Sequence, residues 1–456
     1  MPASSVTRRG AVAALLGAPA IARQAPPSAK PPNFVFLISD DHSAPDLGCY
    51  GNAAIHTPNL DRMAAGGMRF DRCFVSSPQC SPNRASILTG CSPHTTPSSR
   101  IHGPMPDWEP SIVDWLKQRG YHTGAFRKVH QGAGFDKRWN FYGGAREPFT
   151  KFFDSLPAGK PFYLHVGFTD PHRPYAKGAF QPPHDPKTVR LPGFLPDTPE
   201  VRADLADYAD EIARMDAECG QVLELLKKRG LDGDTLVLFT GDNGMPFPPK
   251  GKGTLYEHGI HVPLIARWPG RIKPGQVSRD LIAHVDLPST WLDAAGIPQQ
   301  PKMQGRSFLN LLLGRPYTPR AEIFSERNWH GNFDLCRAVR TDRYKLIFNA
   351  LPRMPYRPIS DLEASPSWES IERLARRGKL PPDQAAAFNP TRPTYELYDL
   401  DRDPLETENL VTSPRHAPIF QDLLDRLNRW MHATYDFVPP PCRSENGGPG
   451  CAPASL

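Results

Sequence analysis

Short runs of apolar, β-branched and aromatic residues recur along the first half of the chain, with helical patterns between them. The pattern predicts a helix over 111–119, after Pro110, and a longer one over 199–229, where apolar residues keep a three-four spacing until Gly230. Strands that alternate with helices predict an α/β fold, in which helices cover both faces of a large, mostly parallel sheet. The runs that predict buried strands of this sheet span residues 34–38, 121–126, 162–168 and 236–239.

The pattern changes in the last third of the chain. Alternating apolar and polar residues at 343–348 and 395–399 predict a smaller antiparallel sheet, and a helix over 419–431 has one apolar face. We therefore expect a large α/β domain over 32–315 and a smaller C-terminal α+β domain over 316–456.

The N-terminus has the pattern of an export signal. Arg8 and Arg9 precede an uncharged stretch over 10–22 that ends in Ala-Ile-Ala, so residues 1–22 are expected to be removed. The paired arginines favour the twin-arginine route and a periplasmic or secreted protein, with a Pro-rich tether at 23–31. The alternative is a frayed amphipathic start. No segment has the ~18 apolar residues of a membrane-spanning helix.

Composition excludes several classes of protein. Among the 456 residues, 39% are hydrophobic and 22% are charged, which excludes a wholly disordered chain and a coiled coil. The 53 prolines are about twice average usage and indicate long ordered loops. A net charge of +6 suits an acidic substrate. No run of Lys and Arg resembles a nucleic-acid patch, so we expect no nucleic-acid partner.

The 8 cysteines contain no C-x-x-C pair or other zinc-like grouping, so we expect no structural zinc site. Cys442 and Cys451 flank a loop rich in Gly and Pro, which makes them candidates for a short disulfide. Their pairing stays open, because sequence alone does not fix disulfide connectivity.

Polar residues follow all four predicted strands of the large sheet. In open α/β sheets, active sites form beyond the carboxyl ends of the strands, so these residues are expected to meet. Each group taken singly has a plain structural explanation, such as a helix cap, a tight turn or a loop histidine. Together they favour one active site. The groups are Asp40-Asp41, Arg127 to His130, Asp170-Pro171-His172 and Asp242-Asn243.

Oxygen donors at these strand ends predict a metal site. Without cysteine or histidine among them, they favour Ca²⁺ or Mg²⁺ over zinc. Lys128, His130 and His172 add positive charge and proton transfer. The set describes a site in which an anionic group is bound to a metal ion and attacked by a nucleophile. The oxygen donors are Asp40, Asp41, Asp242 and Asn243.

The candidate nucleophile lies in the segment C-S-P-N-R-A-S-I-L-T-G over 80–90. Cys80 opens a predicted helix with Pro82 in its first turn, where backbone amides favour negative charge. Arg84 lies four residues on, on the same helical face, within reach of the Cys80 side chain. The plainer alternative is that Cys80 is a small buried hydrophobic residue.

This segment resembles the signature of the sulfatase family, C-x-P-x-R followed by L-T-G, and the resemblance covers nearly the whole mature chain. It implies an alkaline-phosphatase-like fold, hydrolysis of sulfate esters or sulfamides, and one calcium ion. It also implies a maturation enzyme that oxidises Cys80 to formylglycine. Further matches are the Asp-Asp after the first strand, G-Y-H-T at 120–123 with Lys128 and His130, P-H-R-P at 171–174, D-N-G at 242–244, K-G-T-L-Y-E at 252–257 and V-P-L at 262–264.

The resemblance also implies a role for each matching residue. Arg84 and Lys128 would steady the formylglycine hydrate, which is the nucleophile, and His130 would take a proton from it. His172 and Lys252 would hold the sulfate and assist the leaving group, with Lys250 a weaker rival for the role of Lys252. The implied calcium ligands are Asp40, Asp41, Asp242, Asn243 and, as formylglycine, Cys80.

Two positions depart from the family pattern. Asn83 occupies the fourth signature position, which is commonly Ser, although the C-x-P-x-R core for maturation is intact. Phe126 and Arg127 precede Lys128, where a glycine is usual before the lysine. The second departure puts the local backbone in doubt, but not the role of Lys128.

Several segments resemble N-sulfoglucosamine sulfohydrolases, a branch of the family, and so bear on the substrate. The resemblance implies removal of the N-linked sulfate of glucosamine at the end of a heparan-type chain. His330, beside Trp329, is a candidate for the substrate pocket, and a surface loop position is the alternative. The segments span 242–248, 349–355, 364–368, 396–399 and 402–407.

Other functions stay open at this stage. An O-sulfatase acting on another glycan would share the fold, because specificity resides in pocket loops. A phosphoester hydrolase of the same superfamily would use a similar metal site, and a non-catalytic glycan-binding protein would keep Cys80 unoxidised. The expected partners are a sulfated glycan and a formylglycine-generating enzyme. The sequence does not indicate the oligomeric state, and a homodimer is one of the alternatives.

Overall fold

The computed structural model describes residues 30–145 and 147–438. The expected export signal, most of the tether and the Cys442–Cys451 pair therefore lie outside the described residues. Within those two ranges, no helix is long and apolar enough to cross a membrane.

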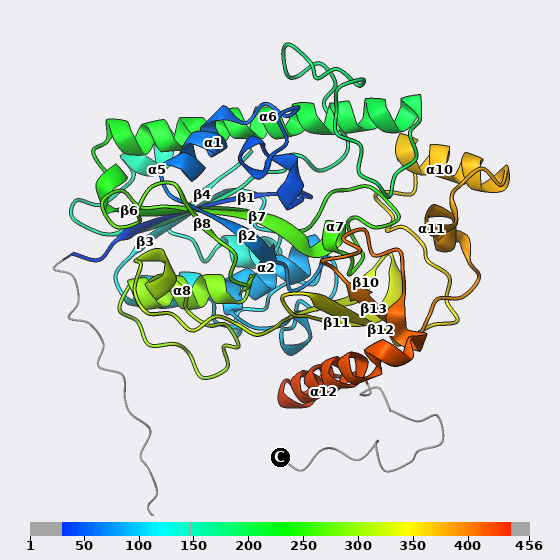
Figure 1. Cartoon of the computed structure of the whole chain (residues 1–456). Coiled ribbons are helices and arrows are strands. Elements are labelled where there is room, and N and C mark those ends of the chain that lie inside the picture. Colours follow the sequence, from blue (N-terminus) through cyan, green and yellow to red (C-terminus); the bar gives the residue numbers. More distant parts are fainter. Residues whose placement is uncertain (1–29, 146, 439–456) are drawn as a thin grey trace, which may run out of the picture.

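A large nine-stranded sheet forms the centre of the molecule (Figure 1). β1 (Asn33–Ser39) lies between β5 (Phe162–Gly167) and β6 (Thr235–Gly241), and β3 (His122–Arg127) pairs with the other edge of β5. These strands run parallel, which confirms the predicted strands and the mostly parallel sheet. The other strands of this sheet are β2 (Met68–Phe74), β4 (Phe141–Gly143), β7 (His261–Arg267), β8 (Gln276–Ser278) and β9 (Ile282–Ala283).

β7 departs from the parallel pattern, because it runs antiparallel to both β6 and β2. The connection from β6 to β7 contains only the four-residue helix α7 (Glu257–Ile260). A parallel partner would need a crossover over one face of the sheet, and this connection instead turns back beside β6. The same connection carries the polar residues that follow β6.

Helices cover both faces of the sheet, as predicted (Figure 1). The long helix α6 (Pro199–Lys228) lies over one face, and its first turn is capped by Thr198, whose Oγ1 accepts a hydrogen bond from the Val201 amide. The remaining helices of this part are α1 (Pro58–Ala65), α2 (Cys80–Thr89), α3 (Ile112–Gln118), α4 (Ala133–Asp136), α5 (Thr150–Asp154), α8 (Asp286–Ala294) and α9 (Leu309–Leu312).

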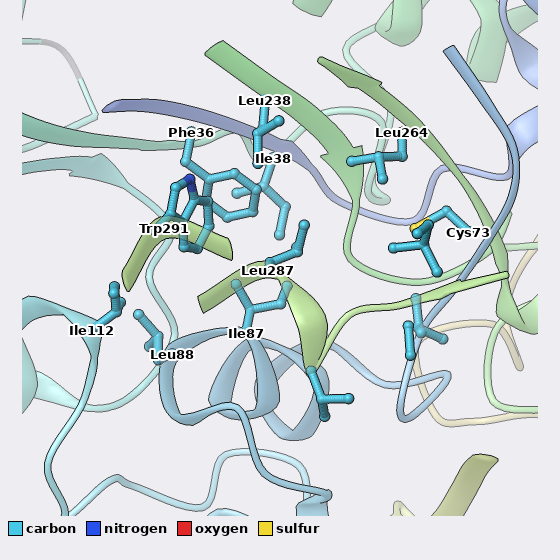
Figure 2. Packing of buried hydrophobic residues seen from close by; sticks show 14 of the residues in the cluster. Phe36, Ile38, Cys73, Ile87, Leu88, Ile112, Leu238, Leu264, Leu287 and Trp291 are labelled. Atoms are coloured by element: carbon cyan, nitrogen blue, oxygen red, sulfur yellow. The ribbon is translucent and has the colours of Figure 1, made fainter. Parts of the chain in front are cut away.

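Side chains of β1 alternate between the two cores, as the period of a strand requires. Phe36 and Ile38 pack in the cluster that contains Trp291 of α8 and Ile87 of α2 (Figure 2). Val35 and Leu37 belong to the cluster under α6. A strand buried on both faces reads as a continuous apolar run, which is why the sequence predicted it.

A second sheet lies in the C-terminal part and is antiparallel throughout, as predicted. Helix α12 (Ala417–Ala433) packs Leu423 and Leu427 against this sheet. The proposed domain boundaries, 32–315 and 316–456, stay a prediction. The strands of this sheet are β10 (Ile323–His330), β11 (Asn332–Arg340), β12 (Tyr344–Asn349) and β13 (Tyr395–Asp399), and two further helices are α10 (Pro366–Arg376) and α11 (Pro382–Ala385).

A buried cluster of charged side chains joins the segment after α2 to the second sheet. His94 pairs through Nδ1 with Glu326 of β10, and its Nε2 lies 2.8 Å from the Thr434 hydroxyl. Beside them, Arg337 of β11 binds Asp436 through two hydrogen bonds. Burial alone would lower the pKa of His94, but the Glu326 carboxylate outweighs it, so the pKa of His94 is raised. The cluster is therefore a charged contact between the two parts.

Replacing His94 with leucine should lower the free energy of unfolding by about 3–5 kcal/mol, because the buried Glu326 carboxylate loses its charged partner and keeps the hydrogen bond from Asn328. Since the pKa of His94 is raised in the folded protein, its charge-dependent stabilisation is complete below the unfolded pKa of about 6.5 and is lost as pH rises through the folded value. Urea unfolding of both proteins should therefore give a larger difference at about pH 5.5 than at about pH 9.

The control is Lys151→Ala, which removes an exposed pair with Glu147 and should change the free energy of unfolding by less than about 0.5 kcal/mol. A His94→Leu loss below about 1 kcal/mol, or a loss that grows with pH, would contradict the charged pairing.

Candidate active site

The carboxyl ends of β1 and β6 bring the predicted oxygen donors together. The two strands are neighbours, with Ser39 opposite Gly241, so the residues that follow them meet at one edge of the sheet. The Asp242 amide donates to the Ser39 carbonyl over 3.0 Å, and the His42 amide donates to the Asn243 carbonyl over 2.7 Å. The four side chains of Asp40, Asp41, Asp242 and Asn243 are buried there.

The acceptors at this edge fit a bound cation. The Asp41 amide donates to Asp242 Oδ1 over 3.0 Å, and Asn243 Nδ2 donates to Asp41 Oδ1 over 2.7 Å, which orients both carboxylates. Asn243 Oδ1 is buried and has no hydrogen-bond partner among the described residues. Carboxylate and amide oxygens gathered at one buried point are the ligands that a hard cation prefers.

Cys80 lies beside this group, at the first residue of α2, as predicted. Its Sγ is 3.4 Å from Asp40 Oδ1 and 3.9 Å from Asp41 Oδ1. Ligand atoms of Asp40, Asp41, Cys80 and His172 all lie within 4.8 Å of one another. Burial raises the pKa of the Cys80 thiol and Asp40 adds to this, so the protein groups alone keep the thiol protonated and a poor nucleophile.

Arg84 and Lys128 supply fixed positive charge next to Cys80. Arg84 Nε donates to Asp242 Oδ2 over 2.7 Å, and its Nη1 donates to the Lys128 carbonyl over 2.6 Å. The third nitrogen, Nη2, is buried, lies 3.9 Å from Asp40 Oδ1 and has no hydrogen-bond partner among the described residues. Lys128 Nζ pairs with Asp40. An unused guanidinium donor beside Cys80 suits an anionic ligand.

The two predicted histidines have opposite electrostatic surroundings. Burial lowers the pKa of His130 to about 3, and the nearby Lys128 and Arg84 add to this effect, so its imidazole is neutral near pH 7. Burial also opposes protonation of His172, but the carboxylates around it, first Asp41, outweigh burial, so its pKa is raised. Two titratable groups whose pKa values are pushed apart are the usual sign of a base and an acid in one site.

Of the two rival lysines, Lys252 faces the site and Lys250 does not. Lys252 is fully buried, and its Nζ donates to Asp41 over 2.8 Å and to Asp361 over 2.6 Å. Lys250 Nζ donates to the backbone carbonyls of Leu405 and Glu406 instead.

His330 reaches the site from the end of β10. It is buried, and its Nε2 lies 3.5 Å from Asp361 Oδ1. Burial lowers the pKa of His330 to about 3, although Asp361 acts in the other direction. Trp329 beside it is 48% exposed. His330 therefore lies beside Asp361 at the site, and its place in a substrate pocket stays a prediction.

Two side chains lie in the site that the sequence had not singled out. Asp361 comes from the loop between β12 and α10, and it lies between Lys252, His172 (3.4 Å) and His330. His102 lies in the turn after α2, 2.8 Å from His130. No local sequence pattern marks Asp361, because this residue reaches the site only when the C-terminal part of the chain packs against the large sheet. A histidine soon after the signature helix was the available signal for His102.

Both departures from the family pattern have a structural explanation. Asn83 Nδ2 donates to the Asp242 carbonyl over 2.6 Å and Asn83 Oδ1 accepts from the Ser76 backbone amide over 3.0 Å, so the Asn83 side chain holds the loop after β6. Arg127 adopts a left-handed φ of 61°, a conformation that glycine adopts without strain, and its guanidinium is paired with Glu218. Lys128 is therefore presented to Asp40 despite the missing glycine.

Comparison with known proteins agrees with this site. The family model described as Sulfatase matches residues 32–297. The chain belongs to the sulfatase family. A second model, described as N-sulphoglucosamine sulphohydrolase, C-terminal, matches residues 250–369. Membership implies a sulfated substrate, a formylglycine and a metal ion, and the buried group of Asp40, Asp41 and Cys80 fits the last two.

Individual relatives support the same conclusion. The sulfatase is 31% identical to human N-sulphoglucosamine sulphohydrolase over 93% of this chain and 95% of the relative. It is 30% identical to human arylsulfatase A over 93% and 94%, and 28% identical to an ulvan-active sulfatase of Formosa agariphila over 89% and 75%. The alignments with the two human relatives cover almost the whole length of each.

Solved structures agree in fold. The structure of BT4656 in complex with its substrate D-glucosamine-2-N,6-O-disulfate has a TM-score of 0.69 at 20% identity, covering 90% of this chain and 99% of that one. The phosphonate monoester hydrolase of Agrobacterium radiobacter has a TM-score of 0.68 at 18% identity, covering 88% and 96%. Both likenesses establish the expected fold class and nothing about the substrate.

Proposed function

We propose that this sulfatase removes the N-linked sulfate of a glucosamine at the end of a heparan-type chain. One observation carries the proposal. The C-terminal model of the N-sulphoglucosamine sulphohydrolases matches residues 250–369, the part of the chain that contributes His330 and Asp361 to the site. Residues that line the site beyond the shared metal and cysteine groups are those that set specificity within a family.

The cation in this proposal is Ca²⁺, held by the oxygens of Asp40, Asp41, Asp242 and Asn243 together with residue 80. Formylglycine made from Cys80 would supply a hydroxyl nucleophile, and a bound cation would neutralise charge on the sulfate oxygens. Arg84 and Lys128 hold residue 80 and add positive charge, since both already contact the carboxylates around it. Lys252 binds the sulfate from the other side.

Proton transfer is divided between the two histidines. His130 is neutral because of burial and its cationic neighbours, and a ring nitrogen of His130 accepts the proton that the formylglycine hydrate releases. His172, which its carboxylate neighbours favour in the protonated form, donates a proton from Nε2 to the departing nitrogen of the glucosamine. Amine leaving groups are poor ones, so this donation matters more for a sulfamate than for an activated ester.

Replacing His172 with alanine should therefore lower kcat/KM on an N-sulfated glucosamine by about 10²- to 10⁴-fold, and much less on an activated aryl sulfate. Steady-state assays of the matured enzyme with both substrates measure the two losses. His432→Ala, an exposed histidine in α12, is the matched control and should change neither. Equal losses on the two substrates would contradict the role of general acid.

The function itself is tested by sulfate release from matched substrates. We expect N-sulfoglucosamine to be cleaved at least about a hundredfold more efficiently than glucosamine 6-sulfate or a phosphate monoester. The second candidate is an O-sulfatase, which the 30% identity to arylsulfatase A favours. Faster release from the 6-sulfate would overturn the proposal in favour of that candidate, and faster phosphate release would favour a phosphoester hydrolase.

A further inference from the structure

His102 lies outside the groups that hold the metal and the sulfate, yet it contacts the proposed base directly. Its Nδ1 is 2.8 Å from His130 Nε2, and the two ring centroids are 4.9 Å apart. The residue is exposed, so packing of a core does not explain it. Its imidazole forms a hydrogen bond with a histidine of the site.

The segments that carry the two histidines are both fixed to the residue after Cys80. The His102 amide donates to Ser81 Oγ over 2.7 Å, and Gln131 Nε2, next to His130, donates to the Ser81 carbonyl over 2.8 Å. The neighbouring Ile101 amide donates to the Trp329 carbonyl over 3.1 Å. The distance between the two rings is therefore set by the start of α2 and by the β10–β11 hairpin.

Both histidines are held in a backbone conformation that L-residues disfavour. His102 has a φ of 55° and His130 a φ of 65°. A left-handed residue other than glycine costs about 1 kcal/mol or more, and such residues persist where the surrounding contacts impose them. Here those contacts bring two imidazoles into hydrogen-bond contact.

The other nitrogen of His130 decides the direction of this hydrogen bond. His130 Nδ1 is buried and has no hydrogen-bond partner among the described residues, and the cations of Lys128 and Arg84 act on the ring more strongly than the carboxylate of Asp40 does. A proton on Nδ1 would be a buried N–H among cations with no acceptor, which is costly. The proton therefore belongs on Nε2, where His102 Nδ1 can accept it.

We propose that His102 is a positioning residue: by accepting the Nε2 hydrogen of His130, it fixes the tautomer whose free Nδ1 is the base inside the site. The inference rests on the proposed function for the role of His130 as base. A partner on the far nitrogen fixes the tautomer and orientation of an imidazole in many catalytic sites.

The first test reads the tautomer and needs no turnover. Nitrogen-15 NMR of the histidine-labelled enzyme, with the His130 signals assigned by comparison with His130→Gln, should show Nε2 protonated and Nδ1 unprotonated. Protonation on Nδ1 in the wild-type enzyme would overturn the proposal, whatever the substrate of the enzyme is.

The second test compares two variants at position 102, with formylglycine content equalised by mass spectrometry and an aryl sulfate as substrate. His102→Leu should lower kcat by about 10- to 100-fold and leave KM within about twofold. His102→Asn, which places an acceptor oxygen near the position of Nδ1, should recover most of kcat, and His432→Leu is the control. A raised KM with unchanged kcat would mean that His102 binds substrate, which contradicts the proposal.

Discussion

Replacing Cys80 with alanine is expected to lower kcat by about 10⁴-fold or more on any sulfate substrate, because the residue that carries the nucleophile is removed. Folding should persist. Cys80 is 1% exposed at the start of α2, and its side chain makes only weak sulfur contacts with Asp40 and Asp41. Deleting one sulfur atom there should cost less than about 2 kcal/mol of unfolding free energy.

The chain offers a matched control for this variant. Cys91 is also buried, follows the other end of α2, and its Sγ contacts the backbone carbonyls of Thr89 and Lys302. Cys91→Ala therefore removes the same atom from the same helix region without touching the site, and it should keep kcat within about twofold. Sulfate release and urea unfolding of both variants make the comparison. Activity of Cys80→Ala above about 1% of wild type would exclude residue 80 as the source of the nucleophile.

The second large effect is expected from removal of the metal ion. Asp40, Asp41 and Asp242 are three buried carboxylates at one point of the molecule, and no described residue donates a hydrogen bond to the side-chain oxygen of Asn243 beside them. A divalent cation neutralises this charge and leaves Lys128 and Lys252 free to bind an anion. Chelation should lower kcat by about 10³-fold, and Ca²⁺ should restore it better than Mg²⁺ or Zn²⁺.

Thermal unfolding distinguishes Ca²⁺ binding at this site from Ca²⁺ binding elsewhere on the protein. A ligand at a hundred times its Kd adds about 2.7 kcal/mol to the free energy of unfolding, which is a measurable rise in Tm. The rise on adding Ca²⁺ should be lost in Asp41→Asn, which keeps the shape of the side chain and removes its charge. A rise of equal size in Asp41→Asn would place the bound ion elsewhere, and full activity in excess chelator would contradict a metal-dependent reaction.

The strands and long helices could be predicted because their signals are local. β1 is buried on both faces and so is apolar throughout, and α6 presents one apolar stripe to the sheet for thirty residues. The outer strands were not predicted. β8 and β9 have only three and two residues, and β10 contains a run of buried polar residues from Ser325 to Asn328, so none of them has a strong period.

The residues of the candidate site likewise fall into those that the sequence predicts and those that it does not. Asp40, Asp242 and Lys128 were predictable because parallel strands end at a common edge, whatever the loops do. The choice between Lys252 and Lys250 depended on how one short loop turns, and two lysines two residues apart look alike in a sequence. Asp361 depends on contacts between distant segments, which no spacing along the chain encodes.

The most direct measurement is the mass of the peptide that contains residue 80, from protein produced together with a formylglycine-generating enzyme that converts a known sulfatase in the same cells. Conversion of the Cys80 thiol to an aldehyde lowers the mass by about 18 Da, and we expect this form to predominate. An unmodified thiol in protein that releases sulfate at full rate would contradict a formylglycine-based reaction. A thiol that persists without activity would contradict the proposal that this chain is matured at Cys80.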